Sequence, residues 1–227
     1  MSAVFDTLVA EYPAWWIDFL GEHNHIGGAD ATRWLLERSG LQRGDRMLDC
    51  GAFVGAAARL AAAETGAAAY ATDLNADFLA AGRALPGGEA VGWVAAATAK
   101  LPFRDGAFAS VWSLDSMILP REMTRVAAPA ATICLCCEVP ADGRGGVEAF
   151  IEEWTGLGWE MRSHRSLSLD ALQAWRAAEA AMVAHRSKYE ARYGKRGYLA
   201  QLDLLAMLVQ SYERGATGHG LFVFVRG

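Results

Sequence analysis

The sequence has no cluster of basic residues and no apolar run long enough to cross a bilayer. Its 227 residues include 21 basic and 26 acidic side chains, a formal net charge of −5. A protein that binds nucleic acid needs a concentrated positive surface, so we expect no nucleic-acid partner. The longest apolar run, residues 126–137, contains Pro129 and is shorter than the roughly 20 residues of a spanning helix. We therefore expect no membrane segment.

The N-terminal stretch "MSAVFDTLVAEY" lacks the basic residues with which a secretory signal begins. We therefore expect a cytoplasmic protein. Cysteine is also scarce, with four in the chain, and Cys134, Cys136 and Cys137 fall in one strand-like run. The paired spacings of a zinc site are absent. We interpret the cysteines as buried core residues and predict no metal site.

Short apolar runs alternate with helix-forming stretches from residue 46 onward. Hydrophobic residues make up 53% of the chain, which is enough for a sizeable core. This alternation is typical of an α/β fold with a mostly parallel sheet covered by helices on both faces. The expected strands are residues 46–50, 67–73, 90–96, 108–115, 131–139, 159–166 and 219–227.

A long helical stretch, residues 168–218, separates the last two expected strands. Ser168 is the expected N-cap of a helix that stops at Gly194, and a second helix follows. An insertion at this edge of the sheet would lie over a pocket mouth, so we interpret it as a helical lid. We divide the chain into an aromatic N-terminal cap segment, residues 1–45, and a core, residues 46–227, that carries the lid.

A glycine-containing turn, "LDCGAFVG", joins the first strand to the first core helix at residues 48–55. Such a turn offers backbone N–H groups to a ligand at the start of a helix. Asp73 ends the second strand and could accept hydrogen bonds from a ribose diol. Phe53 stands where a dinucleotide-binding turn needs glycine beside the pyrophosphate, which favours a cofactor without a pyrophosphate.

These features resemble the class I S-adenosylmethionine-dependent methyltransferases, especially small-molecule enzymes of the sarcosine/dimethylglycine type. The resemblance covers most of the chain. It implies a Rossmann-like, seven-stranded, mostly parallel sheet whose last strand is antiparallel and inserts beside the fifth. The segments that carry it are His25–Gly28, Ala31–Arg33, Leu48–Gly55, Ala71–Asn75, Thr98–Phe103, Phe108–Asp115 and Glu122–Pro129.

The resemblance implies S-adenosyl-L-methionine as the cofactor and a small molecule as the methyl acceptor. His25, beside the Gly-Gly pair, is the expected catalytic base; His23, His164 and His219 are the other histidines we considered. The residues expected to bind the cofactor are Asp49, Gly51, Ala52, Phe53, Gly55, Asp73, Leu74, Thr98 and Asp115. Those expected to contact the acceptor are Tyr12, Trp16, His164, Tyr189 and Tyr193.

The chain departs from the family pattern at Phe53, at Thr98 in place of an aspartate, and at Ala130-Ala131 in place of two glycines. Our leading hypothesis is methyl transfer to nitrogen or oxygen of a metabolite by in-line displacement. A second is other sulfonium chemistry, such as an intramolecular cyclisation that releases methylthioadenosine. A third is a non-catalytic subunit that keeps the fold. The sequence gives no oligomeric state.

Overall fold

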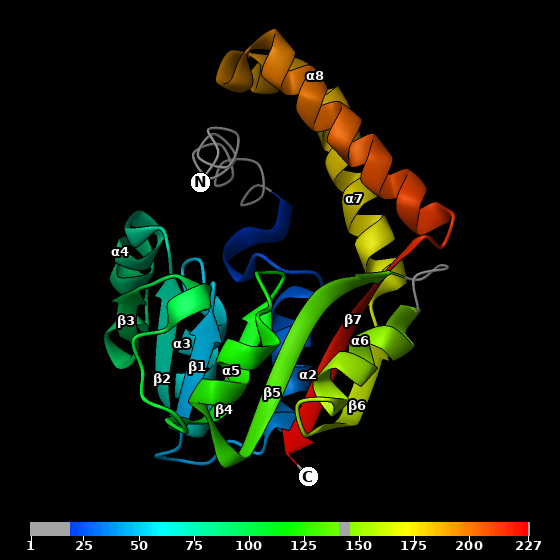
Figure 1. The fold of residues 1–227 in the computed structure, drawn as a ribbon. Helices are drawn as coiled ribbons and strands as arrows, with labels where there is room; N and C mark the ends of the chain where they lie inside the picture. The colour runs from blue at the N-terminus through cyan, green and yellow to red at the C-terminus, as the bar shows by residue number, and fades with distance from the viewer. Residues whose placement is uncertain (1–18, 141–145, 227) are drawn as a thin grey trace.

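The computed structural model describes residues 19–140 and 146–226 (Figure 1). The described part contains one sheet, whose strands lie in the order β3-β2-β1-β4-β5-β7-β6, and β7 alone runs antiparallel to its neighbours. The predicted Rossmann-like sheet, with its last strand inserted beside the fifth, is confirmed. The strands are β1 (Arg46–Cys50), β2 (Ala68–Asp73), β3 (Gly92–Ala95), β4 (Phe108–Leu114), β5 (Ala127–Pro140), β6 (Trp159–Ser166) and β7 (Thr217–Arg226).

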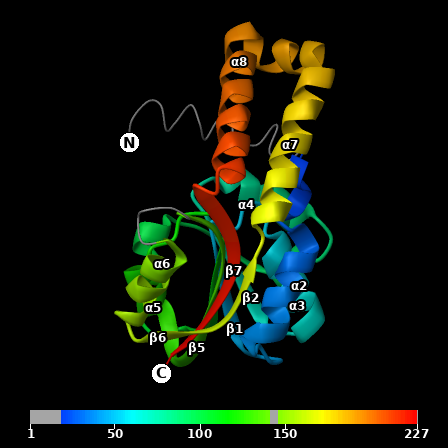
Figure 2. The ribbon, with the colours of Figure 1, turned by 90° about the vertical axis from the view of Figure 1, so that its right-hand side faces the viewer.

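Helices cover both faces of the sheet, as Figure 2 shows, with α2 and α3 on one side and α5 and α6 on the other. No helix within the described ranges is long and apolar enough to cross a membrane. The α-helices are α2 (Gly28–Ser39), α3 (Ala56–Thr65), α4 (Ala76–Ala84), α5 (Pro120–Val126), α6 (Gly146–Thr155), α7 (Ser168–Ala184) and α8 (Arg186–Glu213). Short 3₁₀ helices are η1 (Gly21–His23), η2 (Gly88–Ala90) and η3 (Thr98–Lys100).

Strand β5 shows how the core divides between the two faces. Cys134 and Cys136 belong to the buried cluster that includes residues of α2 and α3, whereas Ile133 and Leu135 belong to the cluster with α5 and α6. Successive side chains of a strand point to opposite faces, so both faces of β5 are apolar. All four cysteines are buried and free, which confirms their interpretation as core residues.

Two helix boundaries follow from the local sequence. The side chain of Asn75 accepts the N–H of Asp77 at 2.9 Å and caps α4, and Gly66 ends α3 with a φ of 74°. The prediction for Ser168 is wrong, because Leu167 is the N-cap of α7 and makes no side-chain cap. The Ser168 hydroxyl instead accepts the N–H of His219 at 3.0 Å, so it ties α7 to β7.

The lid is a pair of helices that rise side by side from the sheet edge (Figure 2). The prediction that the first helix runs to Gly194 is wrong: α7 ends at Ala184, where His185 leaves helical geometry with φ −113° and ψ 33°. Gly194 lies inside α8 and interrupts that helix with φ 70° and ψ 162°. No glycine or proline marks the break at His185.

A buried chain of hydrogen bonds connects β4, β5 and α2. The indole N–H of Trp112 donates to Ser110 Oγ at 2.7 Å, and that oxygen lies 2.7 Å from Thr132 Oγ1. Thr132 Oγ1 donates to the carbonyl oxygen of Ser39 at 3.0 Å. Since Ser110 and Trp112 are fully buried, no solvent can replace these bonds.

Replacing Ser110 with alanine should lower the free energy of unfolding by about 1–3 kcal/mol, because two buried polar groups lose a partner. Urea denaturation followed by tryptophan fluorescence measures the change. The matched control is Ser187→Ala on the exposed surface of α8, which should change stability by less than about 0.5 kcal/mol. Equal losses of stability in the two variants would contradict a stabilising role for this chain of buried hydrogen bonds.

Candidate functional site

Two cavities lie at the carboxyl edge of the sheet. The larger, of about 770 Å³, lies beyond the ends of β1, β2 and β4. The smaller, of about 440 Å³, is bounded by β5, β7 and the two lid helices. Asp115 and Ser116, which follow β4, line both cavities. These two residues therefore mark the point at which molecules in the two cavities could meet.

The turn between β1 and α3 forms one wall of the larger cavity. Gly51, Phe53 and Gly55 adopt positive φ angles of 69°, 54° and 64°. Phe53 is the unusual member, because a residue with a side chain loses about 1–2 kcal/mol in this conformation. Its buried ring lies edge-on against Phe78, with the ring centroids 4.7 Å apart. Phe53 thus supplies an apolar wall to the cavity.

The carboxylate of Asp73 organises this turn. Its Oδ2 accepts the N–H of Phe53 at 3.0 Å, and its Oδ1 accepts the N–H of Asn75 at 2.9 Å. The N–H of Phe53 is therefore engaged and does not point to a pyrophosphate. A carboxylate offers about four acceptor positions, so Asp73 keeps capacity for hydroxyl groups of a ligand in the cavity.

Asp49 is a second carboxyl group in the wall of the larger cavity, and it is 2% exposed. Burial raises the pKa of this group to about 7, and the neighbouring Asp73 charge adds to the shift. Burial also raises the pKa of Asp73. A buried carboxylate is most stable beside a positive charge, so this end of the cavity favours a cationic ligand.

The segment before α2 forms another wall. Asn24 is buried, and its side-chain oxygen has no hydrogen-bond partner among the described residues. A buried acceptor without a donor is costly, so this oxygen suits a ligand with an N–H group. Burial lowers the pKa of the adjacent His23 to about 4, which leaves that ring neutral at pH 7.

Thr98 lies in η3, in the loop that follows β3. Arg125 of α5 donates to the carbonyl oxygens of Leu101 and Phe103, at 3.1 and 2.8 Å. Arg125 also pairs with Glu122, which accepts the N–H of Leu101 at 2.8 Å. The loop is therefore fixed by an ion-pair network, and Thr98 lines the larger cavity.

The structure brings together most of the residues that we predicted to bind a cofactor. Gly55 is the exception: a Cβ there would lie 2.6 Å from the Trp93 ring, so this glycine serves packing. The predicted residues that line the larger cavity are Asp49, Gly51, Ala52, Phe53, Asp73, Leu74, Thr98 and Asp115. Their contacts with a bound molecule stay predictions.

His25, the expected catalytic base, lines neither of these two cavities. The ring is 1% exposed. Its Nδ1 lies 3.0 Å from the carbonyl oxygen of Ile26, and its Nε2 lies 2.9 Å from Thr32 Oγ1. Burial lowers the pKa of His25. Both ring nitrogens hold the loop before α2, so the ring has no free face for a substrate.

The residues predicted to contact the acceptor are not gathered at the two cavities. His164 is exposed on β6 and stacks on Phe222, with centroids 4.6 Å apart. Tyr189 and Tyr193 stack on one another within α8, and Tyr189 lines a separate hollow between the lid helices. Tyr12 and Trp16 lie outside the described residues.

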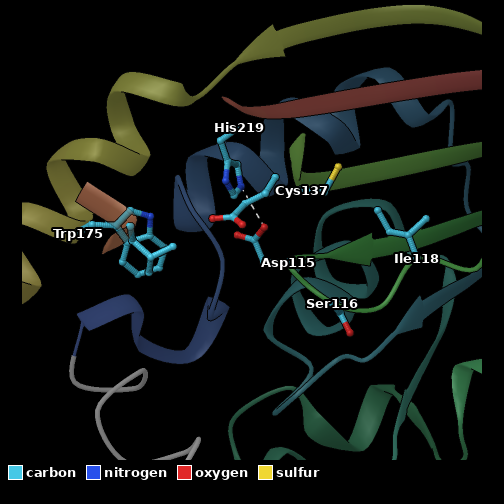
Figure 3. Close-up of a pocket in the computed structure, with 8 residues that line it drawn as sticks. Asp115, Ser116, Ile118, Cys137, Trp175 and His219 are labelled. Atoms are coloured by element: carbon cyan, nitrogen blue, oxygen red, sulfur yellow. Dashed lines mark ion pairs between the residues drawn. The ribbon is translucent and has the colours of Figure 1, made fainter. Parts of the chain in front are cut away.

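The smaller cavity instead contains a buried histidine, His219 of β7 (Figure 3). Its Nε2 lies 2.9 Å from Asp115 Oδ1, and its Nδ1 lies 3.0 Å from the hydroxyl of Tyr212. That hydroxyl donates to Glu138 Oε1 at 2.9 Å. Trp175 of the lid completes the wall opposite, so the cavity combines an aromatic surface with two carboxylates.

Asp115, Cys136 and His219 are the described residues that offer donor atoms close enough together for a metal ion, within 4.8 Å of one another. Burial and the charge of Asp115 raise the pKa of the Cys136 thiol well above its ordinary value. A protonated thiol is a poor ligand, and the 2.9 Å between His219 and Asp115 is a hydrogen-bond distance. Hydrogen bonding therefore accounts for this cluster.

No motif in the sequence identifies Glu138, Tyr212 or Ser116 as site residues, and none ranks His219 above the other histidines. The helical spacing of Tyr212 predicts core packing, and the residue is indeed buried. The spacing does not reveal that the Tyr212 hydroxyl forms hydrogen bonds at the site. The one usable signal is that His219 lies at the start of the last expected strand, just before its apolar run.

Replacing Gly51 with alanine should lower the free energy of unfolding by about 2–5 kcal/mol, combining left-handed strain and overpacking. The added Cβ would lie 1.7 Å from Ser116 Oγ. Gly40→Ala is the matched control, because Gly40 has a φ of 72° but no atom within 4 Å of an added Cβ. Thermal unfolding should show the larger loss for Gly51→Ala; equal losses would contradict the close approach of Ser116.

Comparison with known proteins identifies the central segment. Residues 48–134 match the family described as a methyltransferase domain. An uncharacterized protein of Mycobacterium tuberculosis (strain ATCC 25618 / H37Rv) is 36% identical over 102 residues, or 44% of this chain. The match spans 37% of the length of that curated relative.

Solved structures extend the likeness to the whole fold. A protein from Galdieria sulphuraria, described as a sarcosine dimethylglycine methyltransferase, has a TM-score of 0.84 at 15% identity over 97% of both chains. Phosphoethanolamine N-methyltransferase 2 of Haemonchus contortus, in complex with phosphomonomethylethanolamine and S-adenosylhomocysteine, has a TM-score of 0.79 at 17% identity, over 98% of this chain and 59% of the other. Residues 48–134 therefore match a methyltransferase domain, and the chain has the fold of the class I S-adenosylmethionine-dependent methyltransferases.

Proposed function

We propose that the protein is an S-adenosylmethionine-dependent methyltransferase that acts on nitrogen or oxygen of a small-molecule metabolite. The observation that carries the proposal is the pair of cavities that meet at Asp115 and Ser116. One cavity has the size and chemistry for the cofactor, and the other has the size for a small acceptor. The cofactor supplies a methyl group on a positively charged sulfur, which an acceptor in line with that bond can take.

The larger cavity fits this cofactor at four places. Asp73 has spare acceptor capacity for a ribose diol, and Asp49 offers a carboxylate to the positive methionine portion. Asn24 offers a buried oxygen that lacks a donor among the described residues. Phe53 and Phe78 give an apolar wall. These residues would bind and orient the cofactor, and the lid helices border the neighbouring smaller cavity.

The cavity also bears on the hypothesis of a non-catalytic subunit. Phe53 motivates that hypothesis, because a large side chain could have closed the turn. Its ring is instead buried against Phe78, beside a cavity of about 770 Å³. This space supports the proposal that a cofactor still binds. The alternative reaction, sulfonium chemistry without methyl transfer, would use the same cavity. Its product, methylthioadenosine, distinguishes it from methyl transfer.

Replacing Asp73 with alanine should weaken binding of S-adenosylhomocysteine by about 1–3 kcal/mol, as for a lost hydrogen bond to a charged group. Isothermal titration calorimetry measures the affinity. Asp73→Asn keeps one acceptor oxygen and should lose less, and Asp77→Asn, on the exposed surface of α4, is the charge control. Unchanged affinity in a folded Asp73→Ala variant would remove this residue from the site.

Binding of S-adenosylmethionine should tighten as the pH rises. The raised pKa of Asp49, about 7, means that this carboxyl becomes negative only near neutrality. Because a cationic ligand prefers the ionised form, affinity should fall by up to about tenfold per unit as the pH drops below 7 and level off above it. Titrations between about pH 5.5 and 8.5 cover this window. Asp49→Asn should make the affinity for S-adenosylmethionine less dependent on pH, leaving only the dependence that Asp73 produces. An unchanged slope of affinity against pH would contradict the role of Asp49.

A further inference from the structure

The order of the strands gives the larger cavity a direction. Strands β2, β1 and β4 are neighbours in that order. Asp73 and Phe78 line the cavity where β2 ends and α4 follows, and Asp115 lines it beyond the end of β4. Asp49, from β1, lies between them. A ligand that fills the cavity therefore extends from Phe78, across Asp49, towards Asp115.

Asn24 belongs to the wall near Asp115. The N–H of Ile26 donates to Asp115 Oδ2 at 2.9 Å, which fixes the segment before α2 beside the end of β4. Asn24 lines the cavity and is 7% exposed, and its Oδ1 has no donor among the described residues. Its φ of 52° is left-handed. A buried amide without a partner, held in a costly conformation beside a cavity, indicates contact with a ligand.

His23 adds a second acceptor, and the neighbouring hydrogen bonds fix its tautomer. His25 Nδ1 lies 3.0 Å from the carbonyl oxygen of Ile26, which can only accept, so Nδ1 carries the proton. Burial lowers the pKa of His25, so its Nε2 is bare and accepts the Thr32 hydroxyl proton at 2.9 Å. Thr32 Oγ1 then accepts from His23 Nδ1 at 3.1 Å. Burial lowers the pKa of His23 to about 4, so this neutral ring keeps a bare Nε2 beside the cavity that it lines.

The N–H groups that could hold an anion in this cavity are used within the chain. The N–H groups of Ala52, Phe53 and Gly55 donate to chain oxygens at 2.8, 3.0 and 2.7 Å. The backbone of Ala58, in the first turn of α3, faces the Asp49 carboxyl and partly offsets the rise of its pKa. Asp49 thus lies at the start of α3, where an anionic group of a ligand would otherwise bind.

The cavity also lacks a cation that could pair with a ligand carboxylate. Its described lining includes three carboxyl groups and no lysine or arginine, and the sequence before residue 19 contains neither. Arg33, in α2, pairs with Glu64 at 3.0 Å. Arg59, whose charge reaches His23, pairs with Glu22 at 2.6 Å. A carboxylate in the cavity would therefore meet like charges without a counter-ion.

We propose that the larger cavity recognises the amino group of a sulfonium nucleoside and does not require its carboxylate, so that decarboxylated S-adenosylmethionine binds as well as S-adenosylmethionine. This inference rests on the proposed function and states which ligands the cofactor site takes. An ammonium group has three N–H donors. Asn24 Oδ1 and His23 Nε2 offer two neutral acceptors, and Asp49 offers a charged one.

The charges of the two ligands support the same choice. S-adenosylmethionine has a positive sulfur, a positive amino group and a negative carboxylate. The decarboxylated molecule keeps both positive groups and loses the negative one. Since carboxyl groups line the cavity from β2 to β4, removal of the ligand carboxylate removes a repulsion and sacrifices no ion pair among the described residues.

Two analogues of S-adenosylhomocysteine, each lacking one of the two end groups, test the proposal. 5′-Deoxy-5′-(3-aminopropylthio)adenosine keeps the amine, and 5′-deoxy-5′-(3-carboxypropylthio)adenosine keeps the carboxylate. Calorimetry with the full chain should show the amine analogue binding at least about as tightly as S-adenosylhomocysteine, and the carboxylate analogue about tenfold or more weaker than the amine analogue. 5′-Methylthioadenosine lacks both groups and measures binding of the nucleoside alone.

A substitution at Asn24 tests the contact itself. Asn24→Gly removes the amide, and glycine adopts a φ of 52° without strain, so the backbone should keep its course. The variant should bind the amine analogue about tenfold more weakly than the unaltered protein does. Its affinity for 5′-methylthioadenosine should stay unchanged, because that ligand has no group to reach Asn24. The second ligand is thus the control for the integrity of the cavity.

The outcomes separate this inference from the proposed function. Failure of both S-adenosylhomocysteine and 5′-methylthioadenosine to bind would overturn the proposed function and the inference with it. Normal binding of S-adenosylhomocysteine, with a carboxylate analogue that binds as tightly as the amine analogue, would overturn only the inference. Equal losses for the amine analogue and 5′-methylthioadenosine in Asn24→Gly would also overturn it, because Asn24 would then only shape the loop.

Discussion

The contacts of Asp115 hold together the wall that the two cavities share. Its Oδ2 accepts the N–H of Ile26 at 2.9 Å, and its Oδ1 pairs with His219. Its own N–H donates to the carbonyl oxygen of Cys136 at 2.7 Å. One residue thus joins the segment before α2, the end of β4 and the neighbouring strands β5 and β7. The φ of 47° at Asp115 is costly for a residue with a side chain, and these three contacts hold it there.

Backbone strain in the described chain is concentrated near this junction. Phe53 and Asp115 both have positive φ, and both line the larger cavity. In each case hydrogen bonds over-determine the conformation: Asp73 holds the N–H of Phe53, and the Cys136 carbonyl holds that of Asp115. Such strain persists where the surrounding structure fixes it, and it commonly lies at ligand sites. The rest of the sheet is built from regular parallel pairs with apolar faces.

Local signals in the sequence predict most of the fold and one half of the site. Strand ends, the turn around Phe53 and the cap at Asn75 are encoded within a few residues, so Asp49, Asp73 and Thr98 could be assigned to one cavity. The other half is assembled from residues 115, 138, 212 and 219, which lie far apart in the chain. Only the insertion of β7 beside β5 brings them together. Motif position favoured His25 over His219, because burial and partners of a histidine are tertiary properties. The helix break at His185 has no local signal either.

The most direct test of the proposed function is mass spectrometry of the purified protein after incubation with S-adenosylmethionine. We predict that S-adenosylmethionine or S-adenosylhomocysteine is retained above a control without enzyme, and that no methylthioadenosine forms. Methylthioadenosine formed from the cofactor alone would contradict it, since the turn around Phe53 would then direct attack at another carbon. Cofactor neither retained nor consumed would contradict the assignment of the larger cavity itself.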